Sequence, residues 1–408
     1  MLKPLPVAFA ALTVLLMAAS LMPMLWRLVR MFRGLNEEAP APPHAAGLRG
    51  SLLAACVGLG ACLALYGFSL LAARWQFGTW GDIWQRLPSL WIQWDARHYL
   101  ALAENWYVNT GNERLMLVFF PLFPLLVRGL RLLIGDAFWA AALLNCLCTA
   151  CGCGVLYALA RRRYGARLAR LAVAYLLLNP FAVFLAAPYS EALFLALTLA
   201  ALLASDHGRW GWAALFGALS AATRMLGLVV CGVIALQGLQ RALKAPGWWR
   251  RLLRCGPPAL AALGVGVGFG AYLLLNVLVS GKPFTFLEYQ RTNWSQEFGS
   301  FWRTAYTTVD YGLRFLGSED FVGTWLPQAI SMVAVMTLIA LAQRRLPLAW
   351  AAYSWAYAAI ALAPTWLLSG QRYLMAMATL PLLQAVLTRK TWVHTVSLAA
   401  QGVLLLLC

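Results

Sequence analysis

Long apolar runs separated by short polar connectors make up most of the hydrophobic pattern of the chain. A helix needs about 17 to 25 mostly apolar residues to cross a bilayer. Runs of this kind lie near 5–27, 51–73, 137–160, 169–187, 189–205, 226–242, 258–280, 322–342, 346–367, 372–388 and 391–407, with a shorter run at 211–224. The pattern predicts an all-α polytopic membrane protein with eleven or twelve transmembrane helices.

Composition agrees with this fold class. Apolar residues make up 62% of the 408 residues and charged residues 11%, against about 45–50% and about 25% in soluble chains. These values exclude an intrinsically disordered chain, a disulfide-rich scaffold and a sizeable soluble catalytic domain. We expect one integral membrane domain over residues 1–408.

The net charge of +18 is unevenly spread along the chain. If the connector Trp26–Gly50 faces the cytoplasm, the clusters Arg161–Arg163 and 250–254 face it too, and the cytoplasmic connectors together hold 19 of the 32 Lys and Arg residues. Excess Lys and Arg marks the cytoplasmic side. The basic charge is therefore expected to meet membrane lipids with anionic headgroups, and no nucleic-acid partner is predicted.

The acidic residues indicate the opposite side. They gather in two segments, 74–136 and 281–321, which the same orientation makes the first and second exoplasmic loops. Chemistry is therefore predicted on the noncytoplasmic face.

Two apolar segments need a separate interpretation. The first run has only Lys3 ahead of it and no small-residue cleavage site before Trp26, so residues 1–50 are expected to form a retained anchor helix and a cytoplasmic linker. Counting Phe119–Gly135 as a span would place Arg161–Arg163 on the exoplasmic side, which contradicts the rule that excess Lys and Arg lie on the cytoplasmic side. We therefore predict a buried juxtamembrane or re-entrant helix there, which surrounding protein makes tolerable in the membrane.

Several apparent motifs have simpler explanations. Cys146, Cys148, Cys151 and Cys153 lie within a predicted span and point in opposed pairs at about 100° per residue, so we interpret them as packing residues.

The chain has no Walker loop, HExxH, GxSxG or DxD sequence. Metal-dependent nucleotide-sugar chemistry and ATP-driven transport therefore lose support, and neither a cofactor nor a metal ion is expected.

The string "WIQWDARHYLALAENWY" in the first exoplasmic loop is the most informative segment. Asp95, His98, Tyr99 and Leu102 fall on one face if it is helical. An amphipathic helix in the headgroup layer would hold a carboxylate beside a lipid-borne substrate. The alternative is an interfacial helix that uses Asp95 as its N-cap.

"WDARHY" followed by "FFPLFPLLVR" resembles the paired motif of the PIG-V type membrane mannosyltransferases, the GPI mannosyltransferase II family within the GT-C superfamily. Further matching strings follow in order: "NPFAVFLAAPYSEALF" (179–194), "ATRMLG" (222–227), "GKPFTFLEYQRTNW" (281–294) and "SGQRY" (369–373). Trp106 stands where the family usually has Gly, and the first span looks like an addition before the family's opening helix.

The resemblance implies a GT-C type helical bundle and an inverting transfer of mannose from a polyprenyl monophosphate donor. The acceptor would be a glycan, glycolipid or protein hydroxyl on the noncytoplasmic face. Asp95 matches the position of the catalytic base. Such a base contributes roughly 10²- to 10⁴-fold in rate.

Cations for the leaving phosphate come from the other matching strings. We expect Arg372, with Tyr373 and His98, to bind the lipid phosphate, and Arg224 either to assist or to pair with Glu191. The alternative for both arginines is snorkelling to headgroups.

The remaining candidates would bind the substrate. Glu191, in "YSE" after Tyr189, is either a helix cap or an acceptor-binding carboxylate, and Tyr189 is a further binding candidate. Gln290 and Trp294 are candidates for hydrogen bonding to and stacking on a sugar, although a Trp here can also be an interfacial anchor.

A polyprenyl-lipid flippase or small-solute transporter is the alternative function. It should show two similar halves and midplane charges, whereas this sequence shows no internal repeat. The short loops and the Ala-, Leu- and Arg-rich composition favour a bacterial inner membrane, with an endoplasmic reticulum membrane as the alternative.

Overall fold

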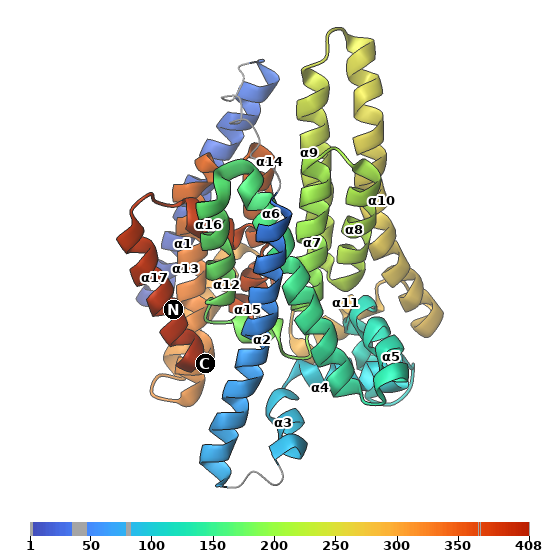
Figure 1. Ribbon diagram of the computed structural model, residues 1–408, viewed down its shortest axis with the longest axis vertical. Helices are drawn as coiled ribbons and strands as arrows, with labels where there is room; N and C mark the ends of the chain where they lie inside the picture. The colour runs from blue at the N-terminus through green and yellow to red at the C-terminus, as the bar shows by residue number, and fades with distance from the viewer. Residues whose placement is uncertain (1–2, 35–46, 79–82, 366, 368, 408) are drawn as a thin grey trace.

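The computed structural model describes residues 3–34, 47–78, 83–365, 367 and 369–407, which form a bundle of helices (Figure 1). Part of the predicted cytoplasmic linker, residues 35–46, lies outside the described residues. Within the described ranges the regular elements are helical, apart from an isolated bridge between Phe298 and Pro364.

Six described helical segments are long and apolar enough to cross a membrane. Three are the single helices α1 (Pro4–Phe32), α2 (Leu48–Phe77) and α10 (Trp248–Ser280). The fourth is α6 (Ala137–Leu177), and the others combine η3 (Met225–Leu228) with α9 (Val229–Leu243), and η4 (Phe321–Trp325) with α13 (Leu326–Ala342) and η5 (Gln343–Arg345). The expected all-α polytopic membrane protein is confirmed.

Shorter helices occupy the other predicted spans. They are α7 (Glu191–Asp206), α8 (Trp210–Thr223), α14 (Leu348–Ala361), α15 (Gly370–Met375), α16 (Leu380–Val386) and α17 (Thr391–Leu407). Helices α7, α8 and α14 bury much of their length inside the bundle, where neighbouring helices replace lipid as their surroundings.

The element α6 differs from its prediction in two ways. Two predicted spans, 137–160 and 169–187, are halves of one element that breaks at Gly165, whose φ of 82° favours glycine. In Figure 1 the green ribbon turns back at this break. The second half ends at Leu177 rather than at residue 187, because Pro180 disfavours helical backbone at Asn179. The segment 179–190 is instead a compact loop with the 3₁₀ turn η2 (Ala182–Leu185).

The two acid-rich loops contain short helices. The first holds α3 (Ile83–Trp91), α4 (Asp95–Asn105), η1 (Glu113–Val118) and α5 (Leu122–Ile134), and the second holds α11 (Thr285–Trp294) and α12 (Phe301–Arg314). Helix α5 has 13 residues and begins after Pro121, so this segment is a short helix and not a full span. The predicted burial holds for one face only, because Leu132 and Leu133 are 86% and 85% exposed. In Figure 1, α3, α4, α5 and α11 lie at the lower end of the bundle.

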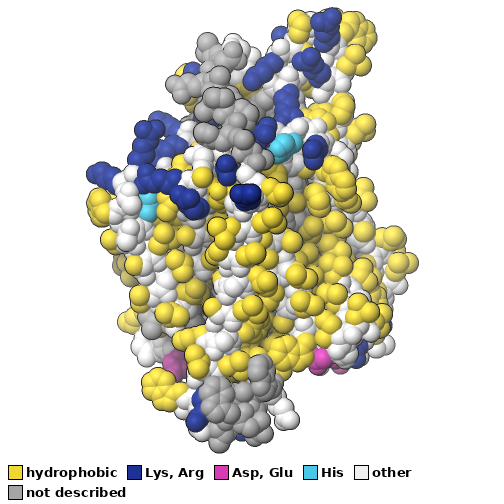
Figure 2. All heavy atoms as spheres, in the orientation of Figure 1, with side chains coloured by type: hydrophobic (Ala, Val, Ile, Leu, Met, Phe, Trp, Pro, Cys, Tyr) yellow, Lys and Arg dark blue, Asp and Glu magenta, His cyan; other side chains and the backbone are white. Residues whose placement is uncertain are grey.

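The basic connectors meet at the opposite end. Arg162 donates to Asp206 at 2.9 Å, and Arg163 pairs with the same carboxylate. Tyr164 donates to the Arg345 carbonyl at 3.0 Å, and Arg167 donates to Thr391 at 2.7 Å. Figure 2 shows most visible Lys and Arg side chains at the upper end and the visible Asp and Glu side chains at the lower end. The structure therefore has the charge asymmetry that the orientation requires.

Candidate active site

Helix α4 presents Asp95 at its first position. The residue before it, Trp94, has φ 45° and ψ −120°. Such backbone costs a bulky residue roughly 1–3 kcal/mol and is common at functional sites. The Asp95 carboxylate makes no cap hydrogen bond and instead accepts one from Arg372 Nη2 at 2.7 Å. The N-cap interpretation of Asp95 is therefore wrong.

At the other end of α4, the backbone of Trp106 has a conformation that suits the Gly usually found at this position in the resembled family. This residue has φ 63° and ψ −170°, a combination that glycine adopts far more readily than a residue with a side chain. A Gly at this position in the family would make the same turn without strain.

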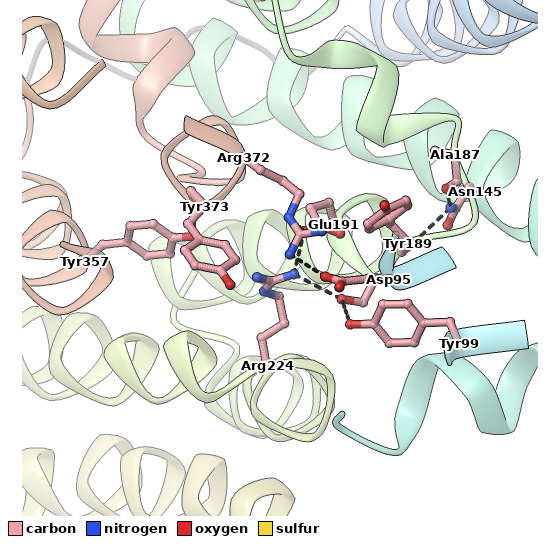
Figure 3. Close-up of polar contacts among 11 residues, drawn as sticks. Asp95, Tyr99, Asn145, Ala187, Tyr189, Glu191, Arg224, Tyr357, Arg372 and Tyr373 are labelled. Carbon is pink, nitrogen blue, oxygen red and sulfur yellow. Dashed lines mark hydrogen bonds and ion pairs between the residues drawn. The ribbon is translucent and has the colours of Figure 1, made fainter. Parts of the chain in front are cut away.

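Arg372, Glu191 and Arg224 form a charged cluster with Asp95 (Figure 3). Glu191 Oε1 lies 2.6 Å from Arg224 Nη1 and 3.1 Å from Arg372 Nε. Arg372 therefore joins the two carboxylates, because its Nη2 contacts Asp95 while its Nε faces Glu191. Residues from α4, α7, α15 and the connection between α8 and η3 meet at this point.

Burial differs sharply within the cluster. The exposed fraction of the side chain is 0% for Glu191, 8% for Arg372 and 14% for Arg224, but 31% for Asp95. The snorkelling interpretation of both arginines is wrong, because their guanidinium groups point inward to carboxylates. Asp95 is the acid of the cluster that a substrate can reach.

Aromatic rings surround the two guanidinium groups. The Tyr373 ring lies 4.9 Å from Arg224 and 5.3 Å from Arg372, and the Tyr189 ring lies 5.0 Å from Arg372. Tyr357 donates to the Tyr373 carbonyl at 2.9 Å and fixes that residue. Cation–π contacts of this kind hold arginines in place without consuming their N–H donors.

Two polar residues that the sequence did not single out also support the cluster. Ser190 lies 2.9 Å from the Tyr99 hydroxyl and 3.1 Å from Arg224 Nη1. Asn145 of α6 donates to the Ala187 carbonyl and, at 3.0 Å, to the Tyr189 carbonyl. These bonds fix the loop that carries Tyr189 and leads into Glu191 at the start of α7. The available signal was an Asn within an otherwise apolar run, since polar groups there are costly and often functional.

Tyr99 is buried beneath the cluster, next to Phe119 and Phe123. Burial raises the pKa of its phenol above the ordinary value. The group therefore stays protonated and holds Ser190 instead of carrying charge. Its predicted role in substrate binding stays a prediction.

The other predicted site residues lie apart from these contacts. The half-buried His98 places its ring 5.3 Å from Phe119. Gln290 and Trp294 belong to α11, and no hydrogen bond or ion pair joins them or His98 to the cluster within the described part of the chain. Their roles in substrate binding stay predictions. In the same described ranges, no three His, Cys, Asp or Glu residues are grouped as metal ligands.

The cluster combines a carboxylate that can accept a proton with two guanidinium groups that can neutralise a leaving phosphate. The arginines are held before any ligand arrives, so little reorganisation opposes charge stabilisation. This is the chemistry that a phosphate-linked donor requires.

Comparison with known proteins finds mannosyltransferases among the proteins that this chain resembles. The model of the family described as dolichyl-phosphate-mannose-protein mannosyltransferase matches residues 120–271. The GPI alpha-1,6-mannosyltransferase 2 of Mus musculus is 33% identical over 218 residues, and that of Rattus norvegicus is 36% identical over 214. Over this stretch the chain is similar to the PIG-V type mannosyltransferases. Each PIG-V match covers 48% of this chain and 39% of the relative.

A solved structure is also similar. It is described as ArnT from Cupriavidus metallidurans bound to undecaprenyl phosphate, with 18% identity and a TM-score of 0.47 over 75% of this chain and 57% of that chain. At this level of similarity neither the ligand nor the site of that enzyme is carried over to this chain.

Proposed function

We propose that the chain transfers mannose from a polyprenyl monophosphate donor to an acceptor hydroxyl with inversion at the sugar C1. The observation that carries this proposal is the accessible Asp95 carboxylate held 2.7 Å from a buried arginine. The mannosyltransferase names of the matching family and of the PIG-V relatives support the sugar and the phosphate-linked donor. The same matches do not favour a flippase or transporter.

The proposed step needs one base and one anion site. Asp95 takes the proton of the acceptor hydroxyl, whose oxygen forms a bond to the sugar C1. The bond between C1 and the phosphate oxygen breaks, and the polyprenyl phosphate leaves with the bonding electrons. Arg372 and Arg224 face the negative charge that develops on this phosphate, while Glu191 keeps both in position.

Radiolabelled sugar transfer by the purified protein tests this function. We expect transfer from polyprenyl-phosphate mannose to a membrane extract, and none from a nucleotide-linked mannose. Transfer from the nucleotide sugar alone would contradict the proposal. Product formation distinguishes an enzyme from a flippase, which would move the labelled lipid unchanged.

Arg372→Lys is expected to raise the KM for the donor by about 10- to 100-fold. Lysine keeps the charge but loses the fork that contacts two oxygens, and a charge-assisted hydrogen bond contributes about 1.5–3 kcal/mol. The measurement is KM in the same transfer assay. Arg291→Lys, on exposed α11, is the matched control and should leave KM unchanged. Equal KM values for both variants would remove Arg372 from the donor site.

We further propose that the cluster lies on the noncytoplasmic face, in a bacterial inner membrane facing the periplasm. The basic connectors at the other end of the bundle support this orientation. In a cysteine-free background, we expect a membrane-impermeant maleimide to label Glu104→Cys in intact cells. Arg250→Cys should be labelled only after lysis, and the reverse pattern would overturn the orientation.

A further inference from the structure

A groove of about 270 Å³ lies between the second half of α6 and the start of α17, away from the Asp95 cluster. Its lining includes cationic, hydroxyl and apolar side chains. Those used below are Arg167, Arg170, Leu171, Ala174, Thr391 and Leu398.

The groove has two guanidinium groups and no acid in its lining. Arg170 is exposed, and no hydrogen bond or ion pair joins its side chain to any residue that the structure describes. Arg167 donates through Nη2 to the Thr391 hydroxyl at 2.7 Å and to the Arg389 carbonyl at 3.5 Å, which leaves its Nε and Nη1 groups available. Unlike Arg162 and Arg163, which share Asp206, these two cations have no carboxylate partner within the described ranges.

The wall of the groove is fixed by His394. This ring is 2% exposed, and its Nε2 lies 3.0 Å from the Thr388 carbonyl, which can only accept a hydrogen bond. Its Nδ1 lies 2.9 Å from the Tyr175 hydroxyl. Both ring nitrogens have partners, so His394 holds the wall of the groove in place and the arginines supply the charge of the lining.

Polarity changes along the groove from charged to apolar. Arg167 and Thr391 lie beside the basic connectors, whereas Leu171, Ala174 and Leu398 lie one to two helical turns further along their helices. At 1.5 Å per residue, Leu398 is about 10 Å from Thr391 along α17. Trp392 is 64% exposed beside the groove. An exposed Trp at a helix start is typical of the headgroup level of a membrane.

We infer that this groove binds an anionic phospholipid. The lipid phosphate would contact Arg167, Arg170 and the Thr391 hydroxyl, and an acyl chain would follow the apolar residues toward Leu398. A phosphate-bearing lipid matches both ends of the groove, whereas free phosphate matches the charged end alone. The inference concerns the end of the bundle opposite to the Asp95 cluster and does not depend on the proposed function.

Native mass spectrometry of the detergent-purified full chain tests this site with phosphatidylglycerol. A basic residue near an anionic lipid contributes about 1 kcal/mol, so Arg170→Gln should weaken binding of the first lipid about fivefold. The double variant with Arg167→Gln should weaken it about 25-fold. Arg254→Gln removes the same charge from an exposed position of α10 and should leave binding unchanged.

Each other outcome overturns the inference. Equal loss in Arg254→Gln would indicate diffuse attraction to surface charge. Equal binding of phosphatidylcholine would indicate an apolar groove without headgroup recognition. Displacement of phosphatidylglycerol by millimolar inorganic phosphate would assign the site to free anions, and unchanged binding in the double variant would place the lipid elsewhere.

Discussion

Asp95→Asn is expected to lower kcat for sugar transfer by roughly 10²- to 10⁴-fold, the usual contribution of a general base. The Asn carbonyl can still accept the hydrogen bond from Arg372, so the fold and the donor site should survive. Donor KM should therefore change little while kcat falls. Steady-state transfer from polyprenyl-phosphate mannose measures both constants.

The control for this variant lies on the same helix. Glu104→Gln removes a carboxylate from the exposed opposite end of α4 and should retain full activity. If Asp95→Asn kept wild-type kcat, Asp95 would not be the base. If it lost donor affinity and kcat together, Asp95 would act in binding through Arg372 rather than in proton transfer.

Glu191→Gln is expected to reduce the free energy of unfolding by about 3–5 kcal/mol, because removing one partner of a buried ion pair leaves uncompensated charge. Glu191 is fully buried and faces both Arg224 and Arg372. Without the Glu191 carboxylate, Asp95 is the remaining carboxylate of the cluster that can balance the charge of the two guanidinium groups. Denaturant unfolding in detergent measures the difference.

A second readout separates this electrostatic role from simple packing. Polyprenyl monophosphate should stabilise Glu191→Gln more than wild type, because its anionic phosphate replaces part of the lost charge. Glu288→Gln, on the exposed face of α11, should change neither quantity. A stability loss below about 1 kcal/mol would mean that the arginines are screened by water instead of held by Glu191.

The apolar spans could be predicted because the bilayer fixes their length. Helix ends within the protein could not, since they depend on local backbone. Gly165 breaks α6 through a positive φ, and Pro180 ends helical backbone before residue 187. The run Phe119–Gly135 was correctly excluded as a span only because the charge pattern opposed it.

The sequence predicted which residues form the candidate site better than it predicted how they are arranged. Asp95 and Arg372 are separated by 277 positions, and nothing in local periodicity pairs them. Both residues were identified because they lie in strings that match motifs of the resembled family in the same order. Ser190 and Asn145 were missed because they act on hydroxyl and carbonyl groups of a loop whose path the sequence does not specify. The placement of Tyr99 beneath Ser190 likewise required the folded chain.

Photocrosslinking tests most directly whether the Asp95 cluster is where the donor reacts. The probe is a polyprenyl phosphate with a photoreactive group beside the phosphate, and peptide mass spectrometry locates the crosslinks. We predict crosslinks in 94–99, 189–191 or 370–375, with competition by unlabelled polyprenyl phosphate and loss in Arg372→Lys. Competed crosslinks confined to the basic connectors at the opposite end would contradict the account.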